Sequence, residues 1–189
     1  MIDLTKIDRS WTLFLDRDGV INHEKYKDYI HTWDEFQFYE GAKEAIALFT
    51  KKFKHIIVIT NQRGIGKGIT RMEDVKLIHK NMSAEIGKAG GRIDAVYFCP
   101  DLDEASPDRK PNTGMGLKAV QDFPDIDLSK TIMVGNTISD MQFGRNAGIY
   151  TVFAATTNPD VPFPHPDIDL RFDSLADFAK SCQPVGKTL

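Results

Sequence analysis

The fold is indicated first by residues 11–22, which read WTLFLDRDGVIN. Residues 11–15 form a short apolar run typical of a buried strand, and it ends at the polar sequence Asp16-Arg17-Asp18-Gly19. Runs of the same character follow at 56–60, 93–98 and 131–134, with a weaker one at 150–153. We therefore predict five buried strands, the first four of which end at polar residues.

The segments between these runs have the spacing of amphipathic helices. After Gly41, for example, apolar residues recur at helical intervals: Ala42, Ala45, Ile46, Leu48 and Phe49. Alternating strands and helices predict parallel strands joined by right-handed crossovers. We therefore expect an α/β three-layer sandwich with a central, parallel, Rossmann-like sheet. A chain of 189 residues fits one domain over 1–189, with a core at about 11–180.

Several residues have the chemistry of helix ends. Thr70 followed by Glu73 is a candidate capping box, and Ser139 and Ser174 are candidate N-caps. Gly148 suits a C-terminal cap. These residues predict helices that begin after positions 70, 139 and 174.

The composition excludes several classes of protein. Hydrophobic residues make up 41% and charged residues 27%, which is typical of a folded globular chain. The net charge of −3 argues against coating nucleic acid or an anionic membrane and favours a small ligand. No apolar run is long enough to span a bilayer, and the N-terminus lacks a continuous apolar signal, so we expect a cytoplasmic protein. Cys99 and Cys182 are expected to be reduced thiols.

Asp16 and Asp18 lie two positions apart where the first strand is expected to end, and Gly19 lets the chain turn away. Because like charges this close repel, either a divalent cation lies between them or one carboxyl is held protonated. A metal-bound Asp16 can attack an electrophile while a protonated Asp18 gives its proton to the leaving group. On these residues alone, a solvated turn rich in Asp is the alternative.

The other strand ends carry groups that suit a phosphoryl group and Mg²⁺. Thr60 and Asn61 offer a hydroxyl and an amide, and Lys110 offers a cation, although a single Lys after a strand is commonly a surface charge. The fourth end brings Asn136 and Asp140, whose oxygens are of the kind that Mg²⁺ prefers. Because ligands gather at the carboxyl ends of parallel strands, the four ends together indicate phosphoryl transfer by positioning and charge neutralisation.

These strand ends resemble the four motifs of the haloacid dehalogenase superfamily of aspartate-nucleophile phosphatases. The matching residues are Asp16-x-Asp18-Gly19-Val20, Thr60-Asn61, Lys110 and Gly135-x4-Asp140. Within the superfamily, the chain is similar to the D-glycero-D-manno-heptose 1,7-bisphosphate phosphatases and to the related histidinol-phosphate phosphatases. LDRDGVIN at 15–22, TNQ-x-GI at 60–65 and RKP at 109–111 carry this closer likeness.

The resemblance implies a role for each matched residue. Asp16 would form an aspartyl-phosphate, and Asp18 would act as general acid and then as base for water. Thr60 and Lys110 would hold the phosphoryl group. The resemblance also implies that there is no large cap domain and that loops 22–38, 63–69 and 99–109 shape the substrate pocket.

A bisphosphate substrate adds a second requirement, because the phosphate that is not cleaved needs its own cation. We predict that Arg109 supplies this cation, assisted by Arg63 or Lys67. Asn61 is expected to contact substrate as well.

The resemblance implies that Mg²⁺ contacts the Asp16 carboxylate, the Asp18 carbonyl and position 136, with support from Asp140. The family pattern has an acid at position 136, whereas this chain has Asn136. An amide oxygen still binds Mg²⁺, but one negative charge is missing. Three explanations stay open: a working enzyme with a weaker metal site, a chain deliberately altered at this position, and a natural protein with diminished catalysis.

Many relatives carry a zinc-binding loop before the position of Lys110. Here that loop offers Cys99, Asp101, Ser106 and Asp108, which include one soft ligand, whereas structural zinc takes four ligands from Cys and His. Structural zinc is therefore not expected. Cys99 is predicted to be a partly buried thiol at a strand end.

The sequence therefore predicts a Mg²⁺-dependent phosphatase acting on a sugar bisphosphate. The heptose 1,7-bisphosphate of lipopolysaccharide-core precursor synthesis is the favoured substrate. The alternatives are a histidinol-phosphate phosphatase and a sugar-phosphate-binding protein weakened in catalysis by Asn136. The expected partner is a small phosphorylated molecule, with no nucleic acid or membrane, and the chain is expected to be a monomer.

Overall fold

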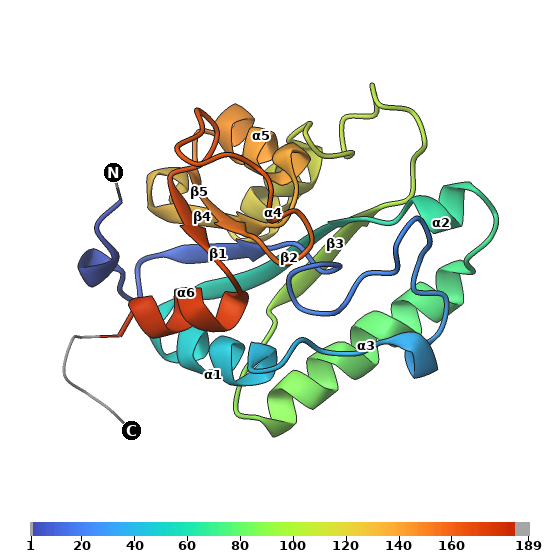
Figure 1. Ribbon diagram of the computed structural model, residues 1–189, viewed down its shortest axis with the longest axis horizontal. Helices are drawn as coiled ribbons and strands as arrows, with labels where there is room; N and C mark the ends of the chain where they lie inside the picture. Colours follow the sequence, from blue (N-terminus) through green and yellow to red (C-terminus); the bar gives the residue numbers. More distant parts are fainter. Residues whose placement is uncertain (1, 184–189) are drawn as a thin grey trace.

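The computed structural model describes residues 2–183 and has a parallel sheet at its centre (Figure 1). Six strands lie in the order β3-β2-β1-β4-β5-β6, and every neighbouring pair runs parallel. Their bounds are β1 (Thr12–Leu15), β2 (His55–Asn61), β3 (Ala95–Cys99), β4 (Thr131–Gly135), β5 (Tyr150–Ala154) and β6 (Leu170–Phe172). The predicted α/β sandwich is confirmed.

Helices cover both faces of the sheet. Figure 1 shows α1, α3 and α6 on one side and α4 and α5 on the other. Their bounds are α1 (Ala42–Lys52), α2 (Arg63–Gly66), α3 (Met72–Lys88), α4 (Gly114–Asp122), α5 (Ile138–Ala147) and α6 (Leu175–Ser181). Short 3₁₀ turns occur at Leu4–Lys6, Trp33–Glu35 and Leu128–Lys130.

The period of two in β1 divides the core between the two layers. Leu13 and Leu15 pack with Phe49 of α1 on one face, whereas Phe14 packs with Phe143 of α5 on the other. All of these side chains are buried. A central strand buried on both faces is therefore continuously apolar, which is why its sequence shows no alternation.

The order of the strands places the site. β1 pairs with β2 on one side and with β4 on the other, with Leu15 opposite both Val58 and Val134. The chain thus changes direction across the sheet at β1, and a crevice at such a switch point is where open α/β sheets bind ligands. The residues that follow β1, β2 and β4 meet there.

Two helix caps differ from the sequence-based predictions. α5 is capped by Thr137, not Ser139, because Asp140 at the third helical position completes a capping box with Thr137. α3 begins after Arg71, and the hydroxyl of Thr70 instead lies 2.7 Å from Nδ1 of His31. The predicted caps at Ser174 and Gly148 are confirmed.

The edge strand β6 was not predicted. It spans only Leu170–Phe172, and its residues are half-buried. It follows a stretch with four prolines between positions 159 and 166, and that composition is typical of irregular structure. Within residues 2–183, no helix combines the length and the apolar character that crossing a membrane requires.

Candidate active site

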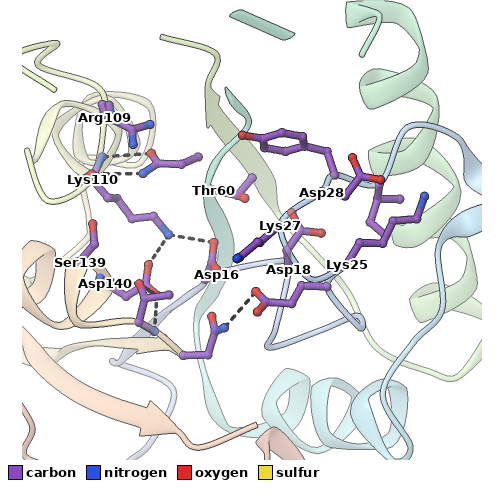
Figure 2. Close-up of a pocket in the computed structure, with 16 residues that line it drawn as sticks. Asp16, Asp18, Lys25, Lys27, Asp28, Thr60, Arg109, Lys110, Ser139 and Asp140 are labelled. Carbon is purple, nitrogen blue, oxygen red and sulfur yellow. Dashed lines mark hydrogen bonds and ion pairs between the residues drawn. The ribbon is translucent and has the colours of Figure 1, made fainter. Parts of the chain in front are cut away.

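A cavity of about 400 Å³ opens at the carboxyl edge of the sheet (Figure 2). Its lining comes from the ends of β1, β2 and β4, from residues 24–30 and from the segment before α4: Asp16, Asp18, Glu24, Lys25, Lys27, Asp28, Tyr29, Ile30, Thr60, Asn61, Arg109, Lys110, Asn136, Thr137, Ser139 and Asp140. The four polar strand ends that the sequence singled out therefore converge. Of the loops expected to shape the pocket, 22–38 and 99–109 contribute to its lining, and 63–69 does not.

Asp16, Lys110 and Asp140 form a buried charge cluster at the floor of the cavity. The Lys110 ammonium lies 2.8 Å from Oδ1 of Asp16 and 2.6 Å from Oδ1 of Asp140, and it donates to the Ile59 carbonyl at 2.7 Å. Their relative exposures are 8% for Asp16, 3% for Lys110 and 2% for Asp140. Two carboxylates around one ammonium leave the cluster with an excess negative charge.

This excess charge shows in the acidity of Asp16. Burial raises the pKa of Asp16 to about 7, because Asp140 adds to the effect and the attraction of Lys110 only partly offsets it. Burial alone would lower the pKa of Lys110, but the two carboxylates outweigh it and raise that pKa. Lys110 is therefore a permanent cation, and a second cation beside Asp16 would favour its ionised form.

The Asp18 carboxylate is held away from the cluster by three donors. It accepts from the Arg17 guanidinium at 2.8 Å, from Nδ2 of Asn22 at 2.9 Å and from Nε2 of Gln62 at 2.9 Å. Burial alone would raise its pKa, but Arg17 and these amides lower the pKa below its ordinary value. In this arrangement Asp18 is an ionised acceptor, so acting as a general acid requires its side chain to leave these donors.

Arg17 and His79 are parts of the site that sequence reasoning missed. Arg17 is fully buried, and its Nη1 lies 3.0 Å from Nε2 of His79 on α3. Burial, together with Arg17, lowers the pKa of His79 to about 3, so the imidazole is neutral and accepts from Arg17. The position of Arg17 between two acids in a buried stretch was a usable signal for that residue. His79 lies 62 positions away, and no feature of the sequence marked it as the partner of Arg17.

Thr60 and Asn61 both line the cavity, but they face different partners. The Thr60 hydroxyl accepts from Nε2 of Gln62 at 3.0 Å, which leaves its own proton free. The Asn61 amide pairs with the Lys110 backbone, donating to its carbonyl and accepting from its N–H, both at 3.1 Å. Asn61 therefore positions Lys110, and its predicted contact with substrate stays a prediction.

Asn136 has one engaged and one free polar atom. Its Nδ2 lies 2.6 Å from the Thr157 hydroxyl oxygen and 3.4 Å from a carboxylate oxygen of Glu24. Its Oδ1 is buried and, among the residues that the structure describes, has no hydrogen-bond partner. An orphaned amide oxygen in a cavity that Asp16 also lines fits a hard cation such as Mg²⁺, so the residues at the predicted metal position suit the ion.

Asp140 is more fully engaged than the sequence suggested. Its Oδ2 accepts from the backbone N–H of Thr137 at 3.0 Å and from the Thr137 hydroxyl at 2.7 Å, while Oδ1 faces Lys110. Both carboxylate oxygens are therefore used. The structure makes Asp140 an orienting partner of Lys110, and its predicted role at the metal stays a prediction.

The cations at the cavity mouth differ from the predicted set. Arg109 lines the cavity as expected, and one of its N–H groups donates to the Asp101 carbonyl at 3.3 Å. Arg63 and Lys67 are not part of the lining. Lys27 is, and in Figure 2 its side chain extends from the loop of residues 24–30 into the cavity. The neighbouring Lys25 runs in a different direction in the same view.

Lys27 also stands out in its backbone and its charge. Its φ is +57°, the left-handed region that residues other than Gly adopt at a cost. Lys25 pairs with Glu35 at 2.7 Å, whereas within residues 2–183 no carboxylate lies within ion-pair distance of Lys27. Because Lys27 lies in an irregular loop, no periodicity in the sequence marked it.

The loop before Lys110 uses its polar side chains internally. Ser106 donates to the Asp101 carboxylate, and Asp108 pairs with Lys118. Cys99 lies at the end of β3, as predicted, but it is fully rather than partly buried. Within residues 2–183, no three His, Cys, Asp or Glu side chains form a metal-binding group.

Comparisons with known proteins agree with this geometry. A family model described as polynucleotide kinase 3 phosphatase matches residues 12–172. A Mycobacterium bovis protein named D-glycero-alpha-D-manno-heptose-1,7-bisphosphate 7-phosphatase is 33% identical over 170 residues, covering 89% of this chain and 90% of that protein. The chain belongs to the haloacid dehalogenase superfamily of phosphatases.

Further relatives within the superfamily extend the likeness. A Campylobacter jejuni protein of the same name is 40% identical over 140 residues, covering 74% of this chain and 79% of that protein. The crystal structure of D,D-heptose 1,7-bisphosphate phosphatase from B. bronchiseptica, complexed with magnesium and phosphate, superposes with a TM-score of 0.81 at 27% identity, covering 90% of this chain and 96% of that one. This superfamily member is accordingly a phosphoric monoester hydrolase, and phosphatases of the superfamily in general depend on Mg²⁺.

Proposed function

We propose that this chain hydrolyses the 7-phosphate of D-glycero-D-manno-heptose 1,7-bisphosphate with Mg²⁺ and Asp16 as nucleophile. The observation that carries the proposal is the cavity itself, which combines a buried Asp16 on the Lys110 ammonium with the cations Arg109 and Lys27 in its lining. The names of the relatives supply the heptose. A bisphosphate matches a pocket that has the Lys110 ammonium at its floor and two further cations, Arg109 and Lys27, in its lining.

Asp16 would begin the reaction. Lys110 binds Oδ1 of Asp16, which leaves Oδ2 to attack phosphorus. The bond from phosphorus to the sugar oxygen breaks as the bond to Oδ2 forms, and an aspartyl-phosphate results. Lys110 and the free proton of Thr60 are placed to neutralise the phosphoryl oxygens.

Asp18 would transfer the protons of both reaction steps once its side chain leaves Arg17. As an acid it gives a proton to the departing sugar oxygen, and as a base it takes one from the water that hydrolyses the aspartyl-phosphate. Because the carboxylate is ionised while it rests on Arg17, Asn22 and Gln62, it would take a proton from solvent on leaving these donors and release one to solvent on returning to them. We infer that these donors form a resting position for the Asp18 side chain.

The residues that would hold Mg²⁺ are Asp16 and Asn136, with the Asp18 carbonyl assigned from the family resemblance. The bound ion supplies charge neutralisation for the phosphoryl group and for Asp16 itself. Because the pKa of Asp16 is raised to about 7 without the ion, this neutralisation also keeps the nucleophile ionised at neutral pH.

Arg109 and Lys27 would bind the phosphate that is not cleaved. Arg109 offers further N–H groups besides the one on the Asp101 carbonyl. Lys27 extends from the loop that covers the opposite side of the cavity (Figure 2). Two cations on different loops would clamp a substrate by its distal end, and an ordinary monophosphate would lack this clamp.

The test is a substrate panel with purified protein. Hydrolysis of the heptose bisphosphate, histidinol phosphate and phenyl phosphate is measured with and without Mg²⁺, for the native chain and for Asp16→Asn. We expect the heptose bisphosphate to give the highest kcat/KM, and both Mg²⁺ removal and Asp16→Asn to abolish turnover. Preference for histidinol phosphate would show that the proposed substrate is wrong. Binding without turnover at saturating Mg²⁺ would show that the proposed catalytic activity is wrong.

The single-domain, monomeric and cytoplasmic character of the chain stays part of this proposal. The sheet is continuous from β3 to β6, which supports one folding unit over residues 12–172. Sedimentation of the purified protein tests the monomer.

A further inference from the structure

The buried Asn136 amide has a defined orientation and an unused oxygen. Its Nδ2 is engaged by Thr157 and Glu24, at 2.6 and 3.4 Å, whereas its Oδ1 has no partner among the described residues. Turning the amide by half a turn would exchange the two atoms at little steric cost. Something in the structure must therefore select the orientation that leaves the oxygen free.

The two partners of Nδ2 differ in what they select. A hydroxyl both donates and accepts, so Thr157 would bind either end of the amide. A carboxylate only accepts, so Glu24 favours Nδ2 and repels Oδ1. Glu24 therefore discriminates between the orientations, and Thr157 anchors the one that is chosen.

The segment that follows β5 makes this anchor rigid. Nδ2 of Asn158 donates to the backbone carbonyl of Asn136 at 2.9 Å and lies 3.2 Å from the Thr157 hydroxyl oxygen. The hydroxyl of Thr156 donates to the Gly19 carbonyl in the turn after β1. Residues 156–158 thus tie the strand end that carries Asn136 to the turn that carries Asp18.

We propose that Glu24 and Thr157 are positioning residues that direct the Asn136 amide oxygen toward a divalent cation. A carboxylate that accepts from Nδ2 polarises the amide and makes Oδ1 a stronger ligand, as partners behind a metal ligand do generally. Asn136 with this support would provide part of what a carboxylate at position 136 provides by charge. The inference rests on the proposed function only in its metal.

The test measures Mg²⁺ binding to the full chain by calorimetry, without any substrate. In Glu24→Gln the new side chain can donate to a flipped Asn136 oxygen, so we expect the Kd for Mg²⁺ to rise about tenfold or more. Asp28→Asn removes a charge from the same cavity without touching Asn136, and we expect its Kd to stay within about twofold. Equal binding by Glu24→Gln and the native chain would overturn the inference.

An Asp at position 136 separates orientation from charge. A carboxylate has two equivalent oxygens and needs no orienting partner, so in an Asn136→Asp background we expect Glu24→Gln to weaken Mg²⁺ binding by less than about threefold. Thr157→Val should weaken binding in the native background, and Thr157→Ser should restore it. An undiminished effect of Glu24→Gln in the Asp background would show a charge effect alone and overturn the positioning role.

These outcomes are separable from failure of the proposed function. If the native chain binds Mg²⁺ but hydrolyses none of the phosphate esters, the function fails and the positioning role is still decided by the Kd values. Melting temperatures of all variants within about 2 °C of the native chain would show that the differences do not reflect unfolding.

Discussion

At the scale of single residues, the site concentrates charge that the folded protein holds at a cost. Asp16 and Asp140 share one ammonium in a place with little access to water, and the raised pKa of Asp16 records that cost. Catalytic sites typically hold a reactive carboxylate at some cost in the stability of the folded protein. A variant that lacks the charge of Asp16 should therefore be more stable and inactive.

Asp16→Asn tests this trade through pH. The pKa of Asp16 is about 7 in the folded protein and ordinarily 3.8, so below about pH 4 the group is protonated in both states and costs nothing. As pH rises toward and through 7, the folded native chain loses that proton and the associated stability. We expect Asp16→Asn to match the native chain near pH 4 and to unfold at a higher temperature at pH 8, without Mg²⁺.

The size of the effect is bounded by about 1.4 kcal/mol for each unit of pKa shift. Thermal unfolding followed by circular dichroism across pH 4 to 8 measures it. The exposed Asp160→Asn is the control and should track the native chain throughout. If the difference between Asp16→Asn and the native chain does not grow with pH, the cluster does not carry the charge cost described.

Asn136→Asp is expected to raise both the affinity for Mg²⁺ and the phosphatase rate at limiting Mg²⁺. The reason is charge, because a carboxylate adds a negative ligand where the native chain offers a neutral oxygen. Initial rates on phenyl phosphate across a Mg²⁺ titration measure the shift, with saturating Mg²⁺ as the reference. Equal rates at limiting Mg²⁺ would contradict this account of position 136.

At the scale of elements, the turn after β1 depends on a residue without a side chain. Gly19 has a φ of +84°, and a Cβ built there would overlap the Asn136 amide. Gly68 has a similar φ of +69°, but a Cβ there would meet nothing within 4 Å. The two glycines therefore separate backbone strain from displacement of Asn136.

We expect Gly19→Ala to lose Mg²⁺ binding and phosphatase activity by at least about a hundredfold, and to lose about 1–3 kcal/mol of stability. Gly68→Ala should lose about 1 kcal/mol from strain and retain activity. Calorimetric Mg²⁺ titration and urea unfolding measure the two effects. Retained Mg²⁺ affinity in Gly19→Ala would show that Asn136 need not sit against this turn.

Strands and helices were predictable where the signal for them lies within one short stretch of the chain. Each strand with a continuous apolar run was predicted, and Asp16 and Thr60 were singled out because they lie at the ends of such runs. Lys110 lies in the loop well after β3, and it was singled out only in combination with the other strand ends. Glu24, His79 and Thr157 were not found, since their partners lie 112, 62 and 21 positions away along the chain. Which loop residues line the cavity depends on how each loop folds back over the sheet, and the periodicity of apolar residues does not predict that path.

At the scale of the whole molecule, a chain with a net charge of −3 places four cationic side chains in the lining of its cavity, among them Lys27. Lys27→Gln tests what this local charge does. We expect KM for the heptose bisphosphate to rise about tenfold, equivalent to about 1.4 kcal/mol of lost binding. The kcat/KM for phenyl phosphate, which has no second phosphate, should stay within about twofold of the native value.

Lys25→Gln is the matched control for this prediction. It removes the same charge from the same loop, but its ammonium is paired with Glu35. We expect both substrates to be hydrolysed by Lys25→Gln at nearly native rates. A Lys27→Gln variant that loses both substrates equally would place Lys27 in general attraction of anions rather than in recognition of the second phosphate.

The central place of β1 in the sheet has an evolutionary consequence. After β1, residues 22–38 form a loop that contributes to the cavity lining before α1 packs on the core. This loop can change in length or in residues while the strands and helices keep their packing. Related hydrolases can therefore acquire new substrate preferences through changes in one loop. An exchange of residues 23–29 between two such hydrolases should transfer substrate selectivity from donor to recipient.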